Sequence, residues 1–153
     1  MISEMERLRA DGLVIREGMR IEQIAALGGI PCKVVDARWH WNKQRFVITN
    51  PLGLVAIVVP DRQSLAVLWN TDESSLEADL YVIAGDRSRQ VEVPDELLIN
   101  DTIESGIYGW FEDFPHESAS VFTCMYTRRR DLAIFRVDID PARGTVVRIS
   151  PSR

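Results

Sequence analysis

The stretch RFVITNPLGLVAIVVPDRQSLAVLWN, residues 45–70, contains three apolar runs separated by two short polar connections. The middle run, residues 54–59, is rich in Val and Ile, whose branched side chains suit a pleated sheet. No polar residue alternates with the apolar ones, which is typical of a strand covered on both faces. The run is also far shorter than the ~20 residues of a membrane-spanning helix.

The two connections in this stretch carry the residues that turns require. Pro51 fixes the backbone of a first turn and Gly53 accepts unusual backbone angles at its exit, and Pro60 opens a second turn. Short connections between apolar runs indicate neighbouring antiparallel strands. We therefore predict a central meander whose three strands cover residues 45–49, 54–59 and 64–69.

Length and composition indicate one globular domain over residues 1–153. The chain is 46% hydrophobic and 27% charged, which are ordinary values for a folded domain. Its beginning shows neither a basic nor an apolar leader segment, and Cys32 and Cys124 are too few for a disulfide framework. These features predict a cytoplasmic protein without a membrane span.

Two N-terminal segments have the spacing of short helices. In residues 2–10, Ser3 and Glu6 match a capping box, and apolar residues recur at every third position. Residues 19–27 show near-helical spacing and end at a double glycine. We expect one or two helices here, packed on the sheet.

The remaining segments read mainly as strands joined by turns. Residues 32–41 alternate cleanly, with Ala37 and Trp39 on the face expected to enter the core. Residues 94–104 are ambiguous, because Pro-Asp-Glu also begins helices well. The other expected strands cover residues 79–84, 89–93, 119–127, 132–138 and 145–149. The predicted fold is α+β: mainly an antiparallel meander of about seven to nine strands with the N-terminal helices.

Charge is distributed unevenly along the chain. The net charge is −5, yet residues 61–117 contain 14 acidic residues and three arginines, whereas residues 118–153 contain seven arginines and three aspartates. One interpretation is that the acidic residues are solvated and partly neutralised in space by the C-terminal arginines. The other is an acidic surface shaped for a basic partner.

The most distinctive segment is IYGWFEDFPHE, residues 107–117, which interleaves four aromatic rings with acids. It is either a loop packed on the core or an interface, since aromatic residues dominate binding hot spots and carboxylates steer basic partners. For the interface interpretation, the candidate contact residues are Asp95, Glu96, Glu104, Tyr108, Trp110, Glu112, Asp113 and Glu117.

The residues that would carry other chemistry lack the necessary spacing. Cys32, Cys124, His40 and His116 form no tight metal-ligand pattern, and no Gly-x-Ser-x-Gly nucleophile motif or cofactor-binding motif occurs. We therefore predict no catalytic residue, metal or cofactor. A pI near 5.1 with a single basic triplet at residues 128–130 disfavours nucleic acid as a partner.

In its general character, and locally in the segment IYGWFEDFPHE, the chain resembles bacterial toxin immunity proteins. The resemblance implies a small, acidic, cofactor-free, non-catalytic protein that binds and neutralises a cognate, basic toxin. Two alternatives remain open. The chain could be a small ligand-binding protein or enzyme with a site at the sheet–helix junction using His40 or His116. It could also be a homo-oligomer, such as a homo-dimer, whose exposed aromatic patch is a self-interface.

Overall fold

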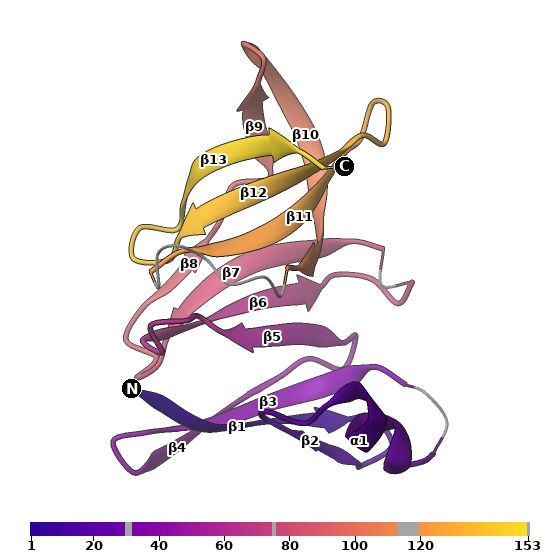
Figure 1. The fold of residues 1–153 in the computed structure, drawn as a ribbon, viewed down its shortest axis with the longest axis vertical. Helices are drawn as coiled ribbons and strands as arrows, with labels where there is room; N and C mark the ends of the chain where they lie inside the picture. The colour runs from indigo at the N-terminus through magenta and orange to yellow at the C-terminus, as the bar shows by residue number, and fades with distance from the viewer. Residues whose placement is uncertain (30–31, 75, 113–119, 153) are drawn as a thin grey trace.

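A computed structural model describes residues 1–29, 32–74, 76–112 and 120–152. Three antiparallel sheets follow one another along the chain and stack as three layers (Figure 1). The first sheet has the strand order β2-β1-β3-β4, the second β5-β6-β7-β8, and the third β13-β12-β11-β10-β9. The second sheet is therefore the middle layer, and it contains two of the three apolar runs of residues 45–70.

The strands account for most of the described chain. In the first sheet they are β1 (Ile2–Arg9), β2 (Val14–Arg16), β3 (Val34–Trp41) and β4 (Gln44–Thr49). In the second sheet they are β5 (Leu54–Val58), β6 (Ser64–Asn70), β7 (Ala78–Ala84) and β8 (Gln90–Glu92). In the third sheet they are β9 (Glu96–Ile99), β10 (Thr102–Phe111), β11 (Phe122–Arg128), β12 (Ile134–Asp140) and β13 (Thr145–Pro151).

Within the middle sheet, the strand buried on both faces is β6, and the prediction that residues 54–59 would hold this position is wrong. In β6, Leu65 and Val67 belong to the core shared with the first sheet, whereas Ala66 and Leu68 belong to the core shared with the third sheet. All four side chains are at most 1% exposed. The strand covered most fully on both faces is thus β6, because β5 lies at the sheet edge and leaves Val55 43% exposed.

The expected three-strand meander is wrong in its pairing, although its three strands exist. β4 pairs with β3 in the first sheet, and only β5 and β6 form a hairpin. The connection between them therefore crosses from one layer to the next. Asn50 holds this crossing, since its side-chain amide donates to the carbonyls of Gly53 and Asn70 at 2.8 and 2.9 Å.

The α+β prediction is also wrong, because residues 2–9 form a strand and the described residues contain one six-residue helix, α1 (Ile21–Ala26). A β-bulge explains the misleading spacing. The β1–β3 register shifts between Ser3 and Glu6, and Glu4 between them has a φ of 53°. The extra residue brings Ile2 and Met5, three positions apart, into the same core.

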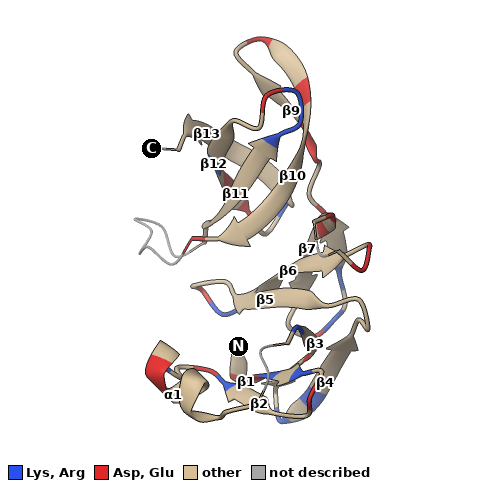
Figure 2. Ribbon diagram, turned by 90° about the vertical axis from the view of Figure 1, so that its right-hand side faces the viewer, with Lys and Arg blue, Asp and Glu red and all other residues tan. Residues whose placement is uncertain are grey.

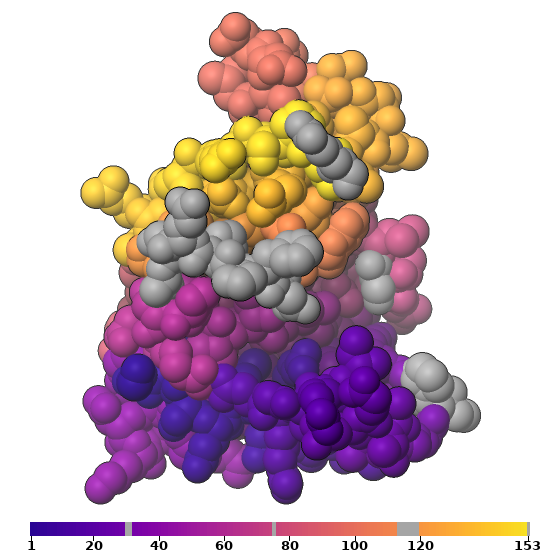
Figure 3. Space-filling model, viewed as in Figure 1, coloured from indigo at the N-terminus to yellow at the C-terminus, as the bar shows by residue number. Residues whose placement is uncertain are grey.

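The ambiguous segment 94–104 forms a hairpin. Leu97 and Ile99 are buried while Leu98 between them is 63% exposed, which is the period of a strand. The turn residues Asn100 and Asp101 have φ values of 50° and 64°, as a type I′ turn requires. The hairpin tip stands clear of the body of the molecule (Figure 3). The described residues form thirteen strands, more than the expected seven to nine, because residues 2–9 were expected to form a helix and residues 96–111 were not assigned as strands.

No helix in the described parts of the chain is long and apolar enough to cross a membrane.

Candidate partner-binding surface

The third sheet has one face in the core and one face, here called the outer face, that no described strand covers. Cys124 and Tyr126 of β11 are fully buried and mark the inner face. Side chains alternate along a strand, so Thr123, Met125 and Thr127 point to the outer face. Pairing then extends the outer face across all five strands of this sheet.

Apolar side chains gather on the outer face in cross-strand neighbours. Ile103 pairs with Leu98, and they are 71% and 63% exposed. Nearer the body, Trp110 is 49% exposed and pairs with Met125, which is itself buried at 6% exposure. Between these pairs lies the cross-strand row Ile107, Thr127 and Ile134. Uncovered large apolar groups that are continuous across neighbouring strands are characteristic of interaction surfaces.

A bulge in β10 brings Trp110 to this face. The β10–β11 register shifts between Tyr108 and Trp110, so Gly109 is an extra residue. Without the shift Trp110 would point inward. With it, Tyr108 and Phe111 contact the core and Trp110 lies on the outer face. Bulges commonly redirect a side chain in this way at functional sites.

Asp95 and Glu96, two of the predicted contact residues, are exposed where β9 begins. Glu96 pairs with Ser105 and so shares the outer face with Leu98 and Ile103. Within the described residues, neither carboxylate forms an ion pair. Both remain available to a partner.

Glu104 and Tyr108 lie in the interior instead. Glu104 is 6% exposed, and its Oε1 accepts a 2.8 Å hydrogen bond from Arg130 while Arg128 lies 3.8 Å away. Tyr108 is 1% exposed, and its hydroxyl donates to the carbonyl of Pro94 at 2.7 Å. Burial raises the pKa of Tyr108, which keeps its hydroxyl protonated. These two residues hold the β9–β10 hairpin in place.

Glu112 lies on the outer face but is already engaged by Arg136, whose Nη2 is 2.7 Å from its Oε2. The candidates Asp113 and Glu117, as well as His116, lie outside the described residues.

Arginines from the C-terminal third neutralise part of the acidic middle segment. Arg129 binds Glu77 through two hydrogen bonds of 2.9 and 2.8 Å. Arg130 also pairs with Glu104, and Arg136 pairs with Glu112. Figure 2 shows the basic β11–β12 turn beside the acidic β9–β10 hairpin. Tyr126 lies near this region, and its pKa rises to about 12 through burial and then the Asp95 and Glu104 carboxylates.

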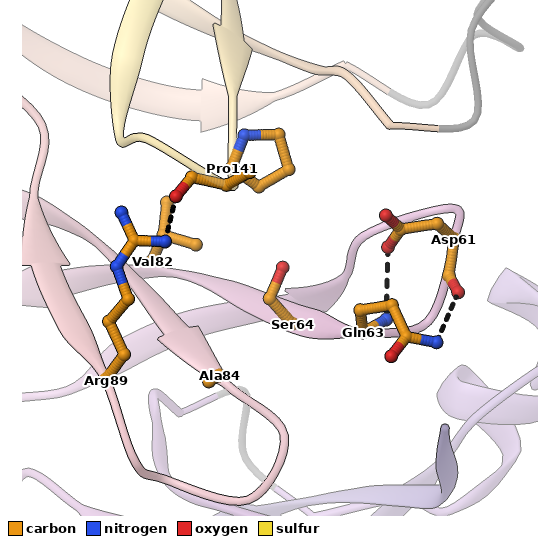
Figure 4. Close-up of a pocket in the computed structure, with 8 residues that line it drawn as sticks. Asp61, Gln63, Ser64, Val82, Ala84, Arg89 and Pro141 are labelled. Carbon is orange, nitrogen blue, oxygen red and sulfur yellow. Dashed lines mark hydrogen bonds between the residues drawn. The ribbon is translucent and has the colours of Figure 1, made fainter.

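A small crevice lies between the second and third sheets (Figure 4). Arg89 and Asp61 lie on opposite sides of it with Ser64 between them. Its volume of about 200 Å³ is below the range of roughly 300–1,000 Å³ usual for ligand pockets. Asp61 already accepts from the Gln63 amide, and Arg89 donates to the carbonyl of Ala142. The crevice is not lined by His40 and lies between two sheets, so it is not the sheet–helix site of the ligand-binding alternative.

The residues considered for catalysis are dispersed. His40 lies on β3 with its Nδ1 3.0 Å from Glu4, far along the chain from the buried Cys124 of β11. Burial raises the pKa of the Cys124 thiol, so the reactive thiolate is disfavoured. Among the described residues, no three His, Cys, Asp or Glu side chains gather as a metal site would require.

Comparison with solved structures decides the relationship. A chain in the structure of Tne2 in complex with Tni2 is 56% identical to this one, aligned over 100% of both chains with a TM-score of 0.96. This chain belongs to the same family as that component of the Tne2–Tni2 complex. No family model and no curated protein matches the sequence.

This family relationship confirms the resemblance to toxin immunity proteins, since Tne2 and Tni2 are a toxin–immunity pair. The outer face of the third sheet contains residues that the sequence did not suggest, above all Leu98 and Ile103. The available signal was the Asn-Asp turn between two alternating runs, which predicts a hairpin and places both residues on one face.

Proposed function

We propose that this chain is the immunity component of a toxin–immunity pair, a non-catalytic protein that binds and neutralises its cognate toxin in the cytoplasm. The observation that carries the proposal is the full-length match to a chain of the Tne2–Tni2 complex.

The placement of its titratable groups supports a binding role over a catalytic one. Catalytic sites usually display groups of strongly shifted pKa in a cleft. Here Cys124 and Tyr108 have strongly raised pKa values because they are buried in the packed core between two sheets. Neither group is placed to meet a substrate.

The proposed contact surface is the outer face of the third sheet together with the acidic residues at its edge. Trp110, Leu98 and Ile103 supply exposed apolar area, and Asp95 and Glu96 supply exposed negative charge. Apolar and aromatic anchors give binding energy, whereas neighbouring charges speed the encounter with a partner of opposite sign. The proposed partner therefore presents a basic surface.

The test is capture of the toxin from native cytosol with this chain as bait, followed over a series of salt concentrations. One stoichiometric, basic partner that is lost at high salt is expected, because screening weakens charge steering. The double variant Trp110→Ala/Glu96→Lys should lose that partner. If the folded double variant still captured the partner, the outer face would not be part of the interface.

A control variant truncates another exposed apolar side chain and reverses another exposed acidic charge elsewhere. Leu76→Ala/Glu73→Lys alters one exposed apolar and one exposed acidic residue in the β6–β7 connection. Because neither residue lies on the third sheet, capture should be unchanged. A native mass that corresponds to two copies of this chain, without a partner, would favour the homo-oligomer alternative instead.

A further inference from the structure

The first sheet covers only half of the middle sheet, and this leaves a groove. β5 and β6 lie beneath the first sheet, where Leu54, Ala56 and Leu65 are buried. On the same face, pairing across the sheet places Tyr81 opposite Val67, and Glu92 opposite Tyr81. Tyr81 is half-buried and Glu92 is exposed. The resulting β4 groove, lined by β4 on one side and by β6, β7 and the β8 residue Gln90 on the other, has a volume of about 560 Å³.

One wall of the β4 groove is the free edge of β4. The Asn50 amide donates to Val35 of the first sheet at 2.7 Å, so Asn50 and the alternate residues before it point toward β3. Arg45, Val47 and Thr49 consequently direct their N–H and C=O groups away from β3. The Val47 carbonyl confirms this direction, because it accepts a 3.1 Å hydrogen bond from Arg87 across the groove.

Such an edge is a template for another strand. Unpaired backbone groups along an edge can accept an extended segment, with side-chain pockets beside the edge giving specificity. The exposed Arg87 guanidinium donates a hydrogen bond to the Val47 carbonyl, and a backbone N–H of an incoming strand can replace that donor. The floor beside the edge is apolar, with Trp69 and Ile83 among its residues.

Two acidic residues stand next to the lining residues Trp69 and Tyr81, at the end of the groove away from Arg87. Asp79 pairs with Trp69, and Glu92 with Tyr81, so both carboxylates lie beside an aromatic ring on one face. Burial and then the Glu92 and Asp79 carboxylates raise the pKa of Tyr81. Neither carboxylate forms an ion pair with any described residue. Two carboxylates beside aromatic rings suit a guanidinium or ammonium group.

We propose that the β4 groove receives an extended, basic segment of the toxin as an added strand on β4, with an Arg or Lys side chain between Tyr81, Asp79 and Glu92. This inference rests on the proposed function and adds a second contact to the outer face of the third sheet.

The test measures the affinity of purified Tne2 for this chain and for two groove variants. Val47→Pro removes an edge N–H that β3 does not use, and Glu92→Lys reverses the charge at the acidic end. Each should weaken binding at least about tenfold, since each removes one of the two recognition elements. In the wild-type complex, the amides of Arg45, Val47 and Thr49 should exchange with deuterium more slowly than in the free protein.

Two matched control variants leave the edge N–H of residue 47 and the acidic end of the groove unchanged. Val47→Thr retains the edge N–H, and Glu22→Lys makes the same charge reversal on the exposed surface of α1. Both should bind Tne2 as the wild type does. Circular dichroism of every variant verifies the fold.

Three results would overturn the inference. Wild-type binding together with unaffected groove variants would remove the β4 groove from the interface and leave the proposed function standing. Absence of wild-type binding would overturn both. A wild-type dimer that Val47→Pro converts to a monomer would show that a second copy of this chain, rather than the toxin, pairs with β4.

Discussion

The indole Nε1 of Trp39 donates a 2.7 Å hydrogen bond to the carbonyl of Gly85, and this bond joins the first sheet to the second. Trp39 is fully buried, so the carbonyl has no access to water once the indole is removed. Trp39→Phe should lower the free energy of unfolding by about 2–4 kcal/mol, through the lost hydrogen bond and the cavity. Urea denaturation measures this, and Trp110→Phe, at a 49% exposed position, should change it by less than about 0.5 kcal/mol.

Leu65→Asp should prevent folding. Leu65 is fully buried in β6 between the first and second sheets, and an unpaired carboxylate there would be separated from water. Val55→Asp should give soluble, folded protein, because Val55 is 43% exposed on the edge strand β5. Circular dichroism and soluble yield distinguish the two variants. Native-like Leu65→Asp protein would show that the middle layer is misplaced.

Glu104→Gln should affect stability and leave toxin binding unchanged. The substitution retains the shape of a buried side chain but removes the charge that Arg130 and Arg128 contact. We expect a loss of about 1–3 kcal/mol in the free energy of unfolding, with the same affinity for the proposed toxin partner. The comparison variant is Glu73→Gln on the exposed surface. Weaker binding by a fully folded Glu104→Gln protein would show that Glu104 contacts the partner.

The Arg128–Asp131 pair should make stability fall in acid. Hydrogen bonds from the Arg128 guanidinium and the Ala133 amide hold the pKa of Asp131 at about 2, below its value in the unfolded chain. A lowered pKa in the folded state stabilises the protein above the unfolded pKa, and this contribution disappears as pH falls toward 2. The difference in unfolding free energy between wild type and Asp131→Asn should be constant above about pH 5 and shrink below about pH 4. A difference independent of pH would contradict this assignment.

The strands of the two-sided middle sheet could be predicted because their apolar runs have no polar alternation. The sequence did not allow us to predict the layer to which each strand belongs. β4 and β5 are separated by a turn-like Asn50–Gly53 segment, and the strand pairing of the structure shows that this segment changes layers, where the Asn50 amide bonds to Gly53 and Asn70.

Bulges limited the prediction in two further places. At Glu4 a bulge gives β1 a three-residue spacing that is also typical of a helix. At Gly109 a bulge reverses the faces of Trp110 and Phe111, so aromatic character alone could not show which ring is exposed. The burial of Glu104 and Tyr108 likewise depends on partners distant in sequence, Arg130 and Pro94.

The most direct test of the central claim is growth of cells that produce the proposed cognate toxin together with this chain. Growth should be restored by the wild-type chain and by Leu76→Ala/Glu73→Lys, and should remain arrested with Trp110→Ala/Glu96→Lys. Continued arrest in the presence of folded wild-type protein would contradict the assignment of this chain as an immunity protein.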